Sequence, residues 1–127
     1  VAECADDSET MKTIKECSDE YGYVIDTHTA VAYAVYNKYV EKTGDETKTI
    51  VASTASPFKF NQSVLIALDG HNSVVGKDEF ELLAELSEKS GLKIPKSLAE
   101  LKTKPVVFST VCEKDEMQQS VNEFLNV

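Results

Sequence analysis

The sequence predicts an α/β fold in which helices pack on a small, partly parallel sheet. Helical apolar spacing alternates along the chain with short segments rich in β-branched residues, an order typical of αβ units. The chain has 127 residues, of which 42% are hydrophobic, with 5 Gly and 3 Pro. This is the size and composition of one globular domain. We therefore expect residues 1–127 to form a single domain, with the α/β part in residues 1–70 and terminal helices with a short strand in residues 71–127.

Two helices are predicted in the first part of the chain. Residues 6–20 are densely charged, but Met11 and Ile14 recur at helical spacing, and Asp6 or Asp7 is placed to cap the first turn. Residues 30–40 form the second helix, which is apolar almost all round. We expect this helix to pack on the sheet. It should also leave an exposed patch through which another segment or another copy of the chain associates.

A strand and a third helix are predicted next. Gly44 ends the second helix, and residues 47–53 have the β-branched content of a strand. Ser56 and Pro57 suit the N-cap and first position of a third helix. Its inner stripe is predicted at Phe60, Val64, Leu65 and Leu68.

The rest of the chain predicts two helices, a helical turn and one strand. Asp78 and Glu81 form a capping-box pair at the start of a helix that Gly91 stops. A second capping box is expected at residues 97–100, a strand at residues 105–111, and a final helix at residues 113–125. The inner residues of the last helix are predicted at Met117, Val121 and Phe124 or Leu125.

Charge and composition exclude several functions. The formal net charge is −9, which disfavours nucleic acid as a partner. The chain also has no Arg, so it lacks the guanidinium group that usually binds phosphate through two parallel hydrogen bonds. The three cysteines lie at no metal-ligand spacing from His28 or His71, so no metal is assigned and a reducing cytoplasm is expected. The longest apolar run, residues 30–36, is too short to span a bilayer. The chain begins with Val1 rather than Met, so we expect that processing or cutting produced this end.

The turn at residues 53–57 is the best candidate for a chemical site. It joins the end of a predicted strand to a helix N-terminus, where ligands collect in open α/β sheets. Ser53, Thr54 and Ser56 carry three hydroxyls within four residues, and a hydroxyl can donate to an uncharged ring nitrogen. The alternative is that Ser56 caps the helix and the other hydroxyls bond locally. Lys59 is the lysine nearest this turn, and it is expected to be solvated or to face substrate.

Asp26 and His28 form a second candidate, as an acid–base pair. Side chains two positions apart at a helix start normally point in different directions, so capping by Asp26 or Thr27 is the preferred interpretation. The usual catalytic patterns are missing from the sequence: no nucleophile elbow is present, and no two glycines fall within four residues of one another. The residues alone therefore show none of the usual catalytic machinery.

Two octets resemble segments of threonine synthases. Residues 25–32, Ile-Asp-Thr-His-Thr-Ala-Val-Ala, resemble the D-P-H-T-A-V segment of that family, and residues 53–60 resemble its S-T-A-x-P-x-K-F segment. The resemblance continues through Ile94 and Pro95 into the terminal helix, so it covers essentially the whole chain as the C-terminal portion. Thr27 is a departure, because the family usually has Pro there.

The resemblance implies a fold-type II enzyme that uses pyridoxal 5'-phosphate to convert O-phospho-L-homoserine and water into L-threonine and phosphate. Residues 1–70 would be part of the cofactor-binding domain. The Schiff-base lysine and the phosphate loop would lie in a missing N-terminal part of the same enzyme, so the fragment alone is expected to be inactive. The motif match implies that Thr54 bonds the pyridine nitrogen of the cofactor, with Ser53 beside it, and that Lys59 and His28 lie near substrate. For His28, packing or capping is the preferred alternative.

Two further interpretations stay open on the sequence. The first is an acidic α/β binding or regulatory module that does no chemistry, because similarity of fold alone would permit it. The second is a small hydrolase that uses Asp26 and His28 with a serine. An upstream segment carrying the lysine and the glycine-rich loop would favour the enzyme over the module.

Overall fold

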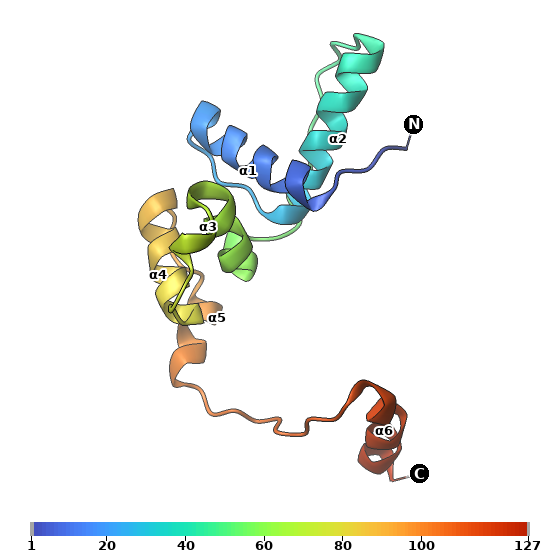
Figure 1. Cartoon of the computed structure of the whole chain (residues 1–127), viewed down its shortest axis with the longest axis vertical. Helices are drawn as coiled ribbons and strands as arrows, with labels where there is room; N and C mark the ends of the chain where they lie inside the picture. The colour runs from blue at the N-terminus through green and yellow to red at the C-terminus, as the bar shows by residue number, and fades with distance from the viewer. Residues whose placement is uncertain (1, 127) are drawn as a thin grey trace.

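The structure is a computed structural model that describes residues 2–126, so Val1 and Val127 lie outside the described residues. Within this range the chain forms six α-helices joined by 3₁₀ turns and extended segments (Figure 1). The α-helices are α1 (Asp7–Tyr21), α2 (Thr27–Thr43), α3 (Asn61–Asp69), α4 (Glu79–Ser90), α5 (Lys96–Ala99) and α6 (Met117–Leu125). The 3₁₀ turns are η1 (Pro57–Phe60), η2 (His71–Ser73), η3 (Glu100–Thr103) and η4 (Lys114–Glu116).

The predicted α/β fold is wrong, because residues 2–126 contain no β-strand. The segments expected as strands, 47–53 and 105–111, have no helical structure, but they pair with no other segment of the described chain. β-Branched residues favour an extended backbone, whereas a sheet also needs a neighbouring strand to complete its hydrogen bonds. Ile50 accordingly has 96% of its surface exposed instead of packing on a sheet. The β-branched pattern marked two segments that are not helical, but it was wrong to predict them as strands of a sheet.

Helix α1 begins and ends as its sequence predicts. The Asp6 carboxylate accepts from the Glu9 N–H at 2.8 Å, and the Glu9 carboxylate accepts from the Asp6 N–H at 3.1 Å. This reciprocal pair is a capping box. Gly22 ends the helix at a φ of 64°, a left-handed conformation that costs glycine little. The helix buries Ile14 and Cys17 against the rest of the molecule.

Helix α2 starts three residues earlier than the predicted range of 30–40, because Asp26 caps it at Thr27. It buries only a narrow face that includes Ala30 and Ala34, and Figure 1 shows α1 lying across it. The Lys38 ammonium pairs with the Glu9 carboxylate of α1 at 2.6 Å. Part of its remaining apolar surface, at Ala32, Val35, Tyr36 and Tyr39, lines an open groove of about 660 Å³ together with residues 49–52. The extended segment therefore lies where the sheet was expected.

The third helix differs from its prediction at its start. Ser56 accepts from the Phe58 N–H at 3.3 Å and Pro57 takes the first position, as predicted, but the turn that follows is the 3₁₀ element η1. α3 then begins at Asn61 and buries Val64 and Leu65. Of the other two residues of the predicted stripe, Leu68 is half-buried, whereas Phe60 is exposed and its inward prediction is wrong.

Helix α4 confirms its predicted cap and stop. The Asp78 carboxylate accepts from the N–H groups of Phe80 and Glu81, both at 2.8 Å, and Gly91 ends the helix at a φ of 68°. The capping box predicted at residues 97–100 is wrong: α5 starts after Pro95 without a side-chain cap. Proline fixes φ near the helical value, so it can begin a short turn without such a cap.

One hydrophobic core joins α1, α2, η1, α3 and α4. It lies where α1, α3 and α4 meet the link between α1 and α2, and Phe58 of η1 closes it. The buried core residues are Ile14, Cys17, Val24, Ile25, Ala30, Phe58, Val64, Leu65, Leu82, Leu83 and Leu86. Burial of these side chains is the main contribution to the stability of the helical body. This body, residues 2–103, positions the residues of the candidate site.

The last part of the chain, residues 104–126, is named the C-terminal arm. It runs away from the helical body as an extended segment and ends in α6, which Figure 1 shows apart from α1–α4. The helix predicted at 113–125 is divided between η4 and α6. The prediction that Met117, Val121, Phe124 and Leu125 point inward is wrong, because all four side chains are exposed. Their spacing is correct for an apolar stripe, but nothing in residues 2–126 covers it.

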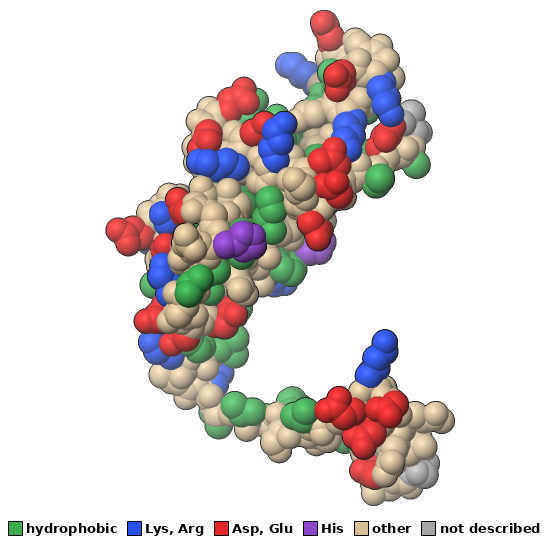
Figure 2. Space-filling view, viewed as in Figure 1, with side chains coloured by type: hydrophobic (Ala, Val, Ile, Leu, Met, Phe, Trp, Pro, Cys, Tyr) green, Lys and Arg blue, Asp and Glu red, His purple; other side chains and the backbone are tan. Residues whose placement is uncertain are grey.

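Charged side chains cover much of the surface, and acidic residues gather around η4 at the start of α6 (Figure 2). In the described part of the chain, no helix combines the length and apolar content needed to cross a membrane.

Candidate functional site

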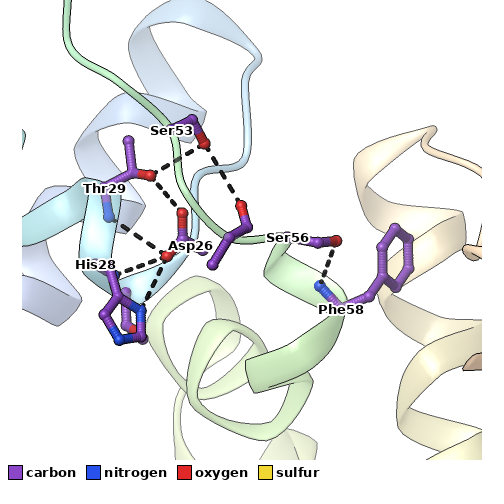
Figure 3. A network of polar contacts seen from close by, with 8 residues as sticks. Asp26, His28, Thr29, Ser53, Ser56 and Phe58 are labelled. Atoms are coloured by element: carbon purple, nitrogen blue, oxygen red, sulfur yellow. Dashed lines mark hydrogen bonds and ion pairs between the residues drawn. The ribbon is translucent and has the colours of Figure 1, made fainter.

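The candidate site is centred on Asp26, whose carboxylate is completely buried. The chain enters α2 here, and one carboxylate oxygen accepts from the N–H of His28 at 2.8 Å and from the N–H of Thr29 at 3.4 Å. The second oxygen accepts from the Thr29 hydroxyl. A buried charge is tolerated only when donors surround it, and here two backbone groups and two side chains do so (Figure 3).

These contacts set the charge state of Asp26. Burial raises the pKa of its carboxyl, but the hydrogen bonds from the Thr29 hydroxyl and from the backbone and ring of His28 lower it by more. The net effect is a pKa below the ordinary value. Asp26 is therefore a buried anion at neutral pH and acts only as an acceptor.

Thr29 connects this carboxylate to the hydroxyl-rich turn. Its Oγ1 lies 3.1 Å from the Ser53 Oγ, which belongs to the extended segment after α2. A hydroxyl has one proton, and the Asp26 carboxylate can only accept, so Thr29 donates to Asp26 and accepts from Ser53. The three side chains form a directed chain from Ser53 through Thr29 to Asp26. This chain fixes the extended segment to the start of α2 (Figure 3).

Thr54, the predicted ring-nitrogen contact, follows directly after this anchor. Its side chain is exposed, and it makes no hydrogen bond with any other residue from 2 to 126. On its other side, Ser56 caps η1 through the Phe58 N–H. The structure therefore holds the backbone on both sides of Thr54 and leaves its hydroxyl available to a ligand.

His28 and Asp26 do not point in different directions, contrary to expectation. The His28 Nδ1 lies 3.2 Å from an Asp26 carboxylate oxygen, and its ring lies against Phe60 with centroids 4.9 Å apart. The contact with Asp26 follows from the cap, because Asp26 must turn back over the first turn of α2 to reach the N–H groups there. An acceptor at Nδ1 means that neutral His28 carries its proton on Nδ1 and has a free lone pair at Nε2.

The remaining predicted residue, Lys59, is exposed in η1. The residue that sequence reasoning missed is Thr29, although a signal was present. A threonine three positions after a capping aspartate lies on the first turn of the helix, within reach of the cap. Only the structure shows that Thr29 also reaches Ser53, which is 24 positions away. No group of three or more potential metal-ligating side chains is found in residues 2–126.

The fold and the site define a helical domain in which the turn at residues 53–57 is held at Ser53 and Ser56 and exposes the Thr54 hydroxyl. The chain belongs to the family described as "Threonine synthase, C-terminal", whose family model matches residues 29–124. The match starts at Thr29 and includes Ser53, Thr54 and Lys59, whereas Asp26 and His28 lie just before it.

A curated relative supports the same family. The threonine synthase of Schizosaccharomyces pombe (strain 972 / ATCC 24843) is 37% identical over 73 residues. The aligned stretch covers 57% of this chain and 14% of the relative, so the chain corresponds to a small part of that enzyme's length.

Proposed function

We propose that this chain is the C-terminal part of a threonine synthase, the enzyme that forms L-threonine and phosphate from O-phospho-L-homoserine and water with pyridoxal 5'-phosphate. The observation that carries the proposal is the family match over residues 29–124. The aligned stretch covers only 14% of the yeast enzyme, which supports the proposal that other parts of the polypeptide supply the cofactor lysine and the phosphate loop. The chain alone is then inactive, and the intact enzyme works in the cytoplasm.

Thr54 is proposed to bond the ring nitrogen of the cofactor. The fit rests on its exposed hydroxyl, which has no partner in residues 2–126, and on the anchored backbone at Ser53 and Ser56. The cofactor, when bound, supplies an electron sink for carbanion chemistry. A neutral hydroxyl next to the nitrogen leaves it largely unprotonated, which moderates that sink. Ser53 lies beside this contact and keeps the segment in place through Thr29.

Lys59 and His28 are proposed to lie near substrate. The substrate carries a phosphoryl group and the chain has no Arg, so a lysine is the cation that this chain can offer. Lys59 follows the turn in η1 with its side chain exposed. His28 offers the free lone pair of Nε2 as an acceptor, because Asp26 occupies Nδ1.

The test is to sequence the gene upstream of the Val1 codon and to express the whole encoded polypeptide. We expect an upstream segment with a lysine and a glycine-rich loop, and a product that releases phosphate and forms threonine only when pyridoxal 5'-phosphate is present. The 127-residue chain, assayed in parallel, should form none. A gene without such a segment, or a full-length product without turnover, would contradict the proposal and favour the acidic binding module.

A further inference from the structure

We infer that the C-terminal arm, residues 104–126, docks its apolar face on the remaining part of the threonine synthase polypeptide. This inference rests on the proposed function and names a contact surface of the same enzyme. It starts from a difference in apolar burial between the helical body and the arm. The helical body has a closed core, whereas the arm leaves eight large apolar side chains exposed, from 54% for Val121 to 92% for Val111. These side chains are Val106, Val107, Phe108, Val111, Met117, Val121, Phe124 and Leu125.

The arm has the pattern of a docking element. In α6 the apolar residues fall at positions 117, 121, 124 and 125, which form one stripe along a helix, and polar residues occupy the opposite side. The stripe continues into an open groove of about 610 Å³ between α6 and residues 108–112. An amphipathic helix whose apolar stripe is uncovered is the form in which helices bind apolar grooves.

The occupant is not the body of this chain, because Figure 1 shows α6 held apart from α1–α4. A second copy of the chain is disfavoured by charge. The chain carries a net charge of −9, and Glu113, Asp115 and Glu116 lie at the start of α6, so two copies would bring acidic surfaces together (Figure 2). The partner should instead present an apolar surface with basic residues at its edge.

The family match identifies where that partner lies. It extends to residue 124, so almost the whole arm belongs to the family domain and is not an appended tail. The aligned 57% of this chain is only 14% of the yeast enzyme, so most of that polypeptide lies outside this chain and is left to provide a surface. An exposed apolar surface on a part of the chain that belongs to the family domain is best explained by a partner within the same polypeptide.

The test compares hydrogen exchange in the 127-residue chain and in the full polypeptide encoded by the gene. In the chain, the amides of α6 should exchange rapidly. In the full polypeptide they should exchange at least about tenfold more slowly, because docking stabilises the helix. The double substitution Val121→Glu and Phe124→Glu should restore rapid exchange. The control, Gln118→Glu with Asn122→Glu, adds the same charge on the other side of α6 and should keep the protection.

The outcomes separate this inference from the proposed function. Rapid exchange of α6 in a full polypeptide that forms threonine overturns the docking surface and leaves the function intact. Slow exchange in a full polypeptide without turnover supports the surface and contradicts the function. Sedimentation of the 127-residue chain as a dimer that the Val121→Glu and Phe124→Glu variant converts to a monomer makes a second copy the occupant, and it too overturns the inference. A gene that encodes only these 127 residues contradicts both.

Discussion

Replacing Asp26 with Ala should destabilise the chain more than removing any other helix cap. Loss of an N-cap costs about 1 kcal/mol of folding free energy. The change also leaves the buried Thr29 hydroxyl without its acceptor, which adds about 1–3 kcal/mol. The expected total is therefore about 2–4 kcal/mol, measured by urea unfolding followed by circular dichroism at neutral pH.

Asp78→Ala is the matched control for this measurement. Asp78 also caps a helix through two backbone N–H groups at 2.8 Å, but it is exposed. Its removal leaves no buried side chain of residues 2–126 without a hydrogen-bond acceptor. Its loss should cost about 1 kcal/mol. Equal destabilisation by the two substitutions would refute the argument that burial and the contact with Thr29 make Asp26 special.

The pH dependence of the Asp26 effect has a definite sign. The pKa of Asp26 is lowered in the folded chain from its ordinary value of 3.8, so the ionised carboxylate stabilises the fold above that pH. The contribution is lost as the pH falls through the folded pKa. The difference in stability between the natural chain and Asp26→Ala should therefore be constant near neutral pH and should shrink below about pH 3.8. A difference that grows on acidification would contradict the assigned charge.

Three further predictions concern the core and the site. Leu86→Ala, at a fully buried position, should cost about 2–5 kcal/mol in urea unfolding, whereas Leu101→Ala on the surface should cost less than about 1 kcal/mol. Thr29→Val should speed amide exchange in the extended segment before η1, and Thr29→Ser should not, because serine keeps the bridging hydroxyl. ¹⁵N NMR should find neutral His28 protonated on Nδ1, and Asp26→Ala should abolish that preference; an unchanged tautomer would contradict the contact.

Local signals allowed most helices to be predicted, whereas tertiary contacts decided the rest. Asp78 and Gly91 act through hydrogen bonds and backbone conformations within a few residues, so their roles could be read from the sequence. The two expected strands could not, because a strand is defined by a partner, and residues 2–126 provide none for residues 47–53 or 105–111.

In the candidate site too, local contacts could be predicted from the sequence and long-range contacts could not. The cap at Asp26 was among the expected alternatives, because it lies directly before its helix. The contact of Asp26 with His28 was predicted wrongly from an average tendency that the cap geometry reverses. The contact between Thr29 and Ser53 joins residues 24 positions apart, and no local pattern reports such a distance.

The most direct test of the account is Thr54→Val in the full polypeptide encoded by the gene. Valine keeps the shape of threonine and removes only the hydroxyl. The absorption band of the bound cofactor should shift, and kcat should fall about tenfold or more, the consequence of losing one polar contact in the site. Thr49→Val, in the same extended segment and also exposed, should change neither. An unchanged spectrum and unchanged turnover in Thr54→Val would contradict the central claim that this turn forms part of the cofactor site.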